Sequence, residues 1–196
     1  LGDMDAEGIV LASTESHQEW EGQSIAELAT SFGQSPQETA EAILAQEPGA
    51  TVVLHSMDED DVQTVMQHPS TMIGSDGIPT LEGKPHPRLY GSFARVLGHY
   101  SRDLGLFKLE TAIHKMTGLS ARKFGLTDRG ELHQGTFADL VVFDQNSIVD
   151  KGTFADPNHY PEGIHHLFVN GVQVINEGEH TGARSGRSLR RSLAIA

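Results

Sequence analysis

The sequence predicts an α/β fold that is followed by a small β unit, and three observations support this prediction. Buried apolar runs alternate with helical patterns over the first 125 residues, which is typical of parallel strands joined by right-handed helical crossovers. After residue 125, short β runs and glycines replace the helical patterns. Asn170-Gly171, between two apolar runs, indicates a β-hairpin with a type I′ turn.

The first part of the chain contains three short apolar runs that we expect to be strands, at residues 8–13, 51–56 and 70–77. Two helices are expected between the first two runs. They begin after Ser24 and Ser35, because each serine precedes a glutamate by three residues, as in a capping box. A third helix is expected after the acidic run 58–61, since the helix dipole favours carboxylates at its N-terminus.

Apolar periodicity predicts further helices, followed by the β unit. The helices are expected at residues 89–104, 109–116 and 120–124. The β unit is expected to contain strands within residues 138–144, 164–169 and 172–175. We therefore predict one unit over residues 1–125 and a second over residues 126–196.

Composition excludes several classes of protein. The net charge of −13 argues against a nucleic-acid binder. The sequence has no cysteine, so this chain supplies neither a disulfide nor a thiolate metal site. No apolar run approaches the roughly 20 residues of a membrane helix, and we expect a cytoplasmic protein without membrane contact. Because the sequence starts at Leu1 instead of methionine, we expect a fragment or a processed chain.

The run 70–77 carries the best candidate for chemistry. It ends in a small residue, a carboxylate and a glycine, which places Asp76 where α/β folds hold their active sites. Gly77 is expected to allow an unusual backbone turn there. Two prolines then stiffen a loop that carries His86 and Arg88. The alternative is that Asp76 only caps the next helix.

Longer motifs resemble known enzymes. Residues 130–144, followed by residues 169–171, resemble the end of an amidohydrolase-superfamily enzyme. Three more stretches resemble the N-acyl-D-amino-acid deacylases (D-aminoacylases), namely residues 74–77, 86–98 and 180–187. The resemblance implies the distal part of a (β/α)8 TIM barrel followed by a small C-terminal β-sandwich portion. It runs from about residue 51 to residue 191 and covers only the C-terminal part of that family's chain.

The same resemblance implies a zinc-dependent hydrolase that acts on small N-acyl-D-amino acids, with most Zn2+ ligands outside this chain. It assigns Asp76 to the metal site as the general base, which takes a proton from the attacking water and passes it to the leaving amine. Arg88 is expected to bind the substrate α-carboxylate through a bidentate pair. His86 and Gly77 are further candidates for substrate binding.

Other residues are weaker candidates. His55 lies near the end of the predicted strand 51–56 and can face the site, but we expect a core or rim role. His165 and His166 are expected on opposite faces of a strand, so they cannot bind one metal together. Trp20 and Tyr90 either line a pocket or pack in the core.

Two alternative functions remain open. The chain holds about half of a barrel and would expose unpaired strand edges, which favours an inactive scaffold fragment that forms a homo-oligomer. A related cyclic-amide hydrolase, similar to dihydropyrimidinase or dihydroorotase, is the other alternative. Residues 86–88 and 181–184 argue against it. We expect the isolated chain to be inactive in either case.

Overall fold

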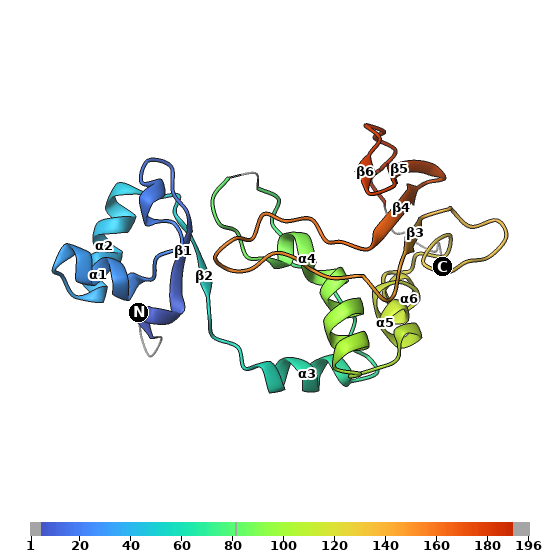
Figure 1. Cartoon of the computed structure of the whole chain (residues 1–196), viewed down its shortest axis with the longest axis horizontal. Coiled ribbons are helices and arrows are strands. Elements are labelled where there is room, and N and C mark those ends of the chain that lie inside the picture. The colour runs from blue at the N-terminus through green and yellow to red at the C-terminus, as the bar shows by residue number, and fades with distance from the viewer. Residues whose placement is uncertain (1–4, 81, 190–196) are drawn as a thin grey trace, which may run out of the picture. The chain divides into compact units, whose positions relative to one another are not determined.

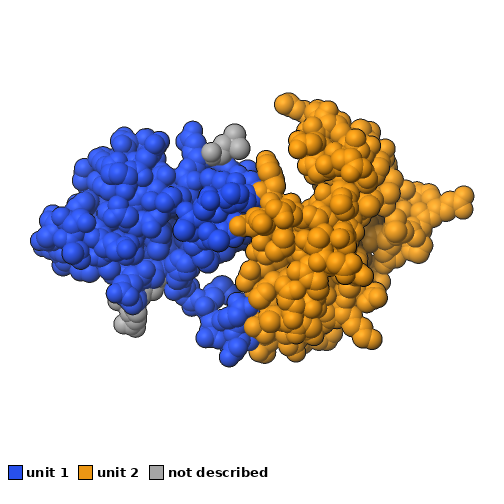
Figure 2. Space-filling view, viewed as in Figure 1, with its two compact units in different colours: residues 1–62, 76–90, 152–159 blue, residues 63–75, 91–151, 160–196 orange. Residues whose placement is uncertain are grey.

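The computed structural model describes residues 5–80 and 82–189, which divide into two compact units (Figure 2). Among the described residues, the first unit comprises 5–62, 76–80, 82–90 and 152–159, and the second comprises 63–75, 91–151 and 160–189. The predicted domain boundary after residue 125 stays a prediction. No helix in the described ranges is both long and apolar enough to span a bilayer.

The first unit contains short helices around two strands (Figure 1). In chain order its elements are η1 (Ala6–Gly8), β1 (Ile9–Ser13), η2 (Gln18–Trp20), α1 (Ile25–Phe32), α2 (Pro36–Gln46) and β2 (Thr51–Leu54). Both predicted capping boxes are confirmed: the Ser24 side chain accepts from the Glu27 main chain at 3.1 Å, and Ser35 and Glu38 form the same motif. These caps satisfy the main-chain N–H groups that a helix start leaves open.

The predicted parallel pairing of the first two strands is wrong. Strands β1 and β2 pair antiparallel, with Ile9 opposite Leu54 and Leu11 opposite Val52. In a parallel βαβ unit, the helix between two strands carries the chain back, so that the second strand runs in the same direction as the first. Here two helices, α1 and α2, connect the strands and pack on each other, so the connection differs from the single-helix crossover of a parallel unit.

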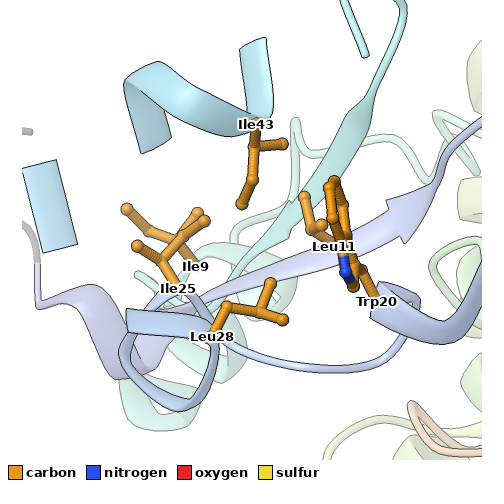
Figure 3. Close-up of a cluster of buried hydrophobic side chains, with 6 residues drawn as sticks. All are labelled: Ile9, Leu11, Trp20, Ile25, Leu28 and Ile43. Carbon is orange, nitrogen blue, oxygen red and sulfur yellow. The ribbon is translucent and has the colours of Figure 1, made fainter. Parts of the chain in front are cut away.

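A compact apolar cluster holds this first unit together (Figure 3). Leu11 from β1 and Leu28 from α1 are both only 1% exposed. The cluster residues are Ile9, Leu11, Trp20, Ile25, Leu28 and Ile43. Burial of each large side chain of this kind contributes about 1.5–3 kcal/mol relative to its exposure, so this cluster is the main reason that the strands and helices stay together.

The strand predicted at residues 70–77 does not form. Residues 71–80 have no regular secondary structure, and Ile73 donates its main-chain N–H to the Lys115 carbonyl at 3.2 Å. The buried Lys115 amine also donates to the carbonyls of His68 and Thr71, at 2.6 and 3.1 Å. No strand in the described residues pairs with this run, and a strand without a partner leaves its main-chain groups unsatisfied.

The helices of the second half and their β unit follow the prediction more closely. Helices α3 (Glu59–Gln67) and α4 (Arg88–Arg95) run from one unit into the other. They are followed in the chain by η3 (Val96–Asp103), α5 (Leu109–Met116) and α6 (Gly118–Phe124). The long helix predicted at 89–104 is present, but its second half, η3, is a π-helix. Gly98 lies in η3 against the Ile148 carbonyl, where a side chain would collide.

The β unit is one antiparallel sheet in the order β3-β4-β5-β6. Its strands are β3 (Leu140–Phe143), β4 (Ile164–Val169), β5 (Val172–Asn176) and β6 (Glu179–His180). The predicted hairpin is confirmed: Val169 pairs with Val172, and Asn170 and Gly171 have φ angles of 51° and 80°. Two positive φ angles are what a type I′ turn requires. The described residues thus contain both helices and sheets, as predicted, but the paired strands among them are antiparallel.

Candidate active site

Asp76 lies in the irregular segment that leads to α4, and its backbone is left-handed, with φ at 49°. Residues other than glycine adopt this conformation rarely, and such residues cluster at functional sites. The Asp76 side chain is 82% exposed, so water and ligands can reach its carboxylate. The turn expected at Gly77 therefore occurs one residue earlier, at Asp76 itself.

Arg88 contacts Asp76 through two groups, although the two residues are 12 positions apart. The Arg88 Nε donates to the Asp76 main-chain carbonyl at 3.1 Å, and Nη2 lies 2.9 Å from the Asp76 carboxylate. The structure thus brings together the two residues that the sequence singled out. The Arg88 side chain is 41% exposed, so the pair is worth little to stability, about 0–1 kcal/mol.

His86 lies at the start of α4 and contacts the main chain of Arg88. Its Nδ1 accepts the Arg88 main-chain N–H at 3.0 Å. Burial lowers the pKa of His86 below its ordinary value, the nearby charges of Arg88 and His55 lower it further, and Asp76 opposes them. The imidazole is therefore neutral near pH 7, with its lone pair on Nδ1 and its proton on Nε2.

Phe154 joins this group, although no motif or periodic pattern predicted it. Its ring packs edge-on against His55, with centroids 4.5 Å apart, and against His86, with centroids 4.9 Å apart. Phe154 belongs to the segment 152–159, which has no regular secondary structure. No periodic pattern marks such a residue. His55 thus packs beside the candidate site, and His86, Arg88 and Asp76 form a continuous set of contacts.

The other candidates lie elsewhere or have structural roles. Trp20 is 8% exposed and stacks on His17 at 3.9 Å, so it belongs to the core. Tyr90 is half-buried in the first turns of α4. His166 contacts Gln173 and Glu177, while the neighbouring His165 is exposed, as expected for neighbours on opposite faces of a strand.

Within residues 5–80 and 82–189, no three histidine or carboxylate side chains come together as a set of metal ligands. Asp76 has an accessible carboxylate, but His86 offers no lone pair to a metal, since its Nδ1 accepts a main-chain N–H. The described residues therefore do not form a complete zinc site.

Comparison with known proteins gives close relatives. The chain is 49% identical over 176 residues to a D-aminoacylase of Alcaligenes xylosoxydans xylosoxydans, and 44% identical over 180 residues to an N-acyl-D-glutamate deacylase of the same organism. These alignments cover 90% and 92% of this chain but only 35% and 36% of the relatives. The chain thus spans about a third of the length of the curated relatives it matches.

Solved structures give the same result. A D-aminoacylase with a binuclear metal centre has a TM-score of 0.85 and 45% identity, over 93% of this chain and 38% of that one. An N-acyl-D-glutamate deacylase from Bordetella bronchiseptica, complexed with zinc and a phosphonate inhibitor, has a TM-score of 0.80 and 40% identity. That match covers 86% of this chain and 35% of the other.

These relatives carry the names of the enzymes that residues 74–77, 86–98 and 180–187 resemble, which confirms that resemblance. The model of the amidohydrolase family matches residues 6–175, which is most of the sequence. The matched region includes Asp76, His86 and Arg88. The chain therefore belongs to the amidohydrolase family.

Proposed function

We propose that this chain forms part of a metal-dependent deacylase that hydrolyses N-acyl-D-amino acids to a D-amino acid and a carboxylate. The observation that carries the proposal is the geometry of Asp76. Its carboxylate is accessible, its backbone is left-handed, and Arg88 contacts both its carboxylate and its main-chain carbonyl. The 49% identity to a D-aminoacylase supports the choice of substrate class.

In this proposal Asp76 is the general base. A water oxygen forms a bond to the amide carbonyl carbon, and the Asp76 carboxylate takes the water proton. When the C–N bond breaks, Asp76 passes that proton to the leaving amine. Zinc, when bound, would polarise the carbonyl and lower the pKa of water. Since the described residues do not form a complete zinc site, its other ligands would come from outside them.

Arg88 binds the α-carboxylate of the substrate in the same scheme, and Gly77, the next residue after Asp76, lies beside the substrate. The substrate carboxylate and the Asp76 carboxylate are both acceptors for the Arg88 fork. Substrate binding would therefore break the contact between Arg88 Nη2 and the Asp76 carboxylate, and Nη2 would bind the substrate carboxylate instead. The hydrogen bond from Arg88 Nε to the Asp76 carbonyl would keep the left-handed turn at Asp76 in place. This exchange releases the Asp76 carboxylate to act as a base.

The proposal extends to the fold of the complete deacylase. We infer that the chain contributes the distal part of a (β/α)8 TIM barrel and a small β-sandwich portion, which the TM-score of 0.85 to a D-aminoacylase supports. In the described residues, β1 and β2 are antiparallel and residues 71–80 form no strand. The barrel strands would accordingly form only against the rest of the enzyme.

A replacement experiment tests the function. The matched region of the Alcaligenes D-aminoacylase is exchanged for this chain, and release of D-leucine from N-acetyl-D-leucine is measured by chiral chromatography. We expect the chimera to release D-leucine and to spare N-acetyl-L-leucine. We also expect the 196-residue chain alone to release none, because residues 5–80 and 82–189 do not form a complete set of metal ligands. A folded, zinc-loaded chimera without turnover, or turnover by the chain alone, would contradict the proposal.

Arg88→Ala should raise KM for N-acetyl-D-leucine in the chimera by about 10–100-fold, with a smaller change in kcat. The reason is that hydrogen bonds to a charged group contribute about 1.5–3 kcal/mol to the binding free energy. The contact between Arg88 and the substrate carboxylate is present both in the bound substrate and in the transition state, so its loss raises KM more than it lowers kcat. Arg88→Lys should be intermediate, because lysine keeps the charge but loses the planar fork. Arg122→Ala, on α6, is the matched control. An unchanged KM for Arg88→Ala would remove Arg88 from the binding site.

A further inference from the structure

The start of α4 depends on His86 and its neighbour Pro87. The Arg88 N–H donates to the His86 Nδ1 at 3.0 Å, and the Leu89 N–H donates to the His86 carbonyl at 3.1 Å. The Tyr90 N–H donates to the Pro87 carbonyl, also at 3.1 Å. A helix start leaves such N–H groups without partners, so His86 fixes the helix at the residue that carries the guanidinium.

The imidazole of His86 is itself held in place. Phe154 packs edge-on against it at 4.9 Å, and His55 packs on the same phenyl ring at 4.5 Å. The ring is partly buried, which favours its neutral form, and only a neutral ring with an unprotonated Nδ1 can accept from Arg88. These contacts give His86 one orientation and one tautomer.

Arg88 in turn contacts Asp76, the proposed general base. Arg88 holds Asp76 through the main-chain carbonyl at 3.1 Å and through the carboxylate at 2.9 Å. The left-handed conformation of Asp76 costs of order 1–3 kcal/mol and persists only when the surroundings maintain it. Arg88 is one of the groups that favour this conformation, and its position depends on the helix start that His86 caps.

We propose that His86 is a positioning residue: its Nδ1 fixes the main chain of Arg88, and through Arg88 it sets the geometry of Asp76. This inference rests on the proposed function, and it differs from the sequence-based expectation that His86 binds substrate directly. A substrate contact would use the Nε2–H, whereas a positioning role needs only an acceptor where Nδ1 lies.

Two substitutions separate these roles. An asparagine side chain can place its oxygen near the position of Nδ1, while a glutamine side chain places its amide near the position of Nε2. We expect His86→Asn to keep kcat/KM in the chimera within about threefold of the parent, because the cap survives. We expect His86→Gln to lower kcat/KM by about 10–100-fold, through both KM and kcat, because misplaced catalytic groups cost about that much.

His180 provides the matched control. Its Nδ1 accepts the Gly182 main-chain N–H at 2.9 Å, which is the same kind of hydrogen bond, two residues along the chain, as that from Arg88 to His86. His180 lies in the β unit. His180→Gln should leave KM and kcat unchanged. The inference is wrong if His86→Gln behaves like the parent, if His86→Asn is impaired as strongly as His86→Gln, or if His180→Gln causes the same loss.

A second measurement does not depend on activity. Nitrogen-15 NMR of the 196-residue chain reports the tautomer of His86 and the exchange of the Arg88 Nε–H. We expect an unprotonated Nδ1, and an Arg88 Nε–H that exchanges faster in His86→Gln than in His86→Asn. A protonated Nδ1 would overturn the inference while leaving the deacylase proposal intact. An inactive parent chimera with the expected tautomer would instead count against the deacylase proposal alone.

Discussion

Asp76→Asn should lower kcat of the chimera by about 10²–10⁴-fold, because an amide cannot take the proton of the attacking water. The fold should survive the substitution. Asparagine has nearly the same shape as aspartate and tolerates the left-handed backbone that Asp76 adopts at 49°. The side chain is 82% exposed, so no packing is lost. The measurement is steady-state release of D-leucine from N-acetyl-D-leucine, with circular dichroism to establish the fold.

Asp60→Asn is the control for this change. Asp60 is an exposed carboxylate in the first turn of α3, so the same chemical substitution there should leave kcat within about twofold, as expected for surface changes away from the site. Hydrolysis by Asp76→Asn at the parent rate would remove Asp76 as the base. An equal loss in both variants would indicate a general effect of charge instead.

Glu47→Ala should lower the thermal unfolding midpoint of the 196-residue chain by roughly 5–10 °C. Glu47 is 1% exposed and accepts the main-chain N–H groups of Glu15 and Ser16 at 2.8 and 2.9 Å. Its Oε1 also lies 2.6 Å from the His17 Nδ1. Removal of the carboxylate leaves these groups without their acceptor and opens the loop between β1 and η2. Calorimetry checks the shift, with Glu41→Ala on the exposed face of α2 as the control.

The same carboxylate should make stability depend on pH. The hydrogen bond from His17 is the main cause that holds the pKa of Glu47 below its ordinary value of 4.5, with the Glu15 and Ser16 N–H groups adding to it against burial. The folded state thus binds this proton less readily than the unfolded state, so the stabilisation is present above about pH 4.5 and is lost as the pH falls through the folded-state pKa. The difference in midpoint between the parent and Glu47→Ala should therefore shrink below pH 4.5. A difference that stays constant down to pH 3 would contradict this account.

Local signals in the sequence predicted local structure well. The capping boxes at Ser24 and Ser35 and the hairpin at Asn170-Gly171 depend on neighbours within a few residues, and all three are confirmed. Pairing between distant strands is not local. The run 70–77 has the composition of a strand, but a strand forms only against a partner, and no strand in the described part of the chain pairs with it.

The candidate site likewise combines residues that the sequence predicted with a residue that it could not predict. Asp76 and Arg88 were identified from a short motif and a family resemblance, and the structure brings them into contact. Phe154 could not be identified in advance, because it reaches His55 and His86 from a segment without periodic pattern far along the chain. The left-handed turn was expected at Gly77, since glycine adopts it without strain, but it occurs at Asp76, where Arg88 holds both the carbonyl and the carboxylate.

A crystal structure of the chimera with zinc and a non-hydrolysable N-acyl-D-amino acid analogue would show directly whether Asp76 and Arg88 contact the reacting groups. We expect the Asp76 carboxylate to lie within hydrogen-bond reach of the attacking water, at about 2.6–3.2 Å. We also expect the guanidinium of Arg88 to contact the α-carboxylate of the ligand. An Asp76 side chain that points away from the ligand and the metal, with Arg88 remote from the α-carboxylate, would contradict the assignment of this chain to the chemistry.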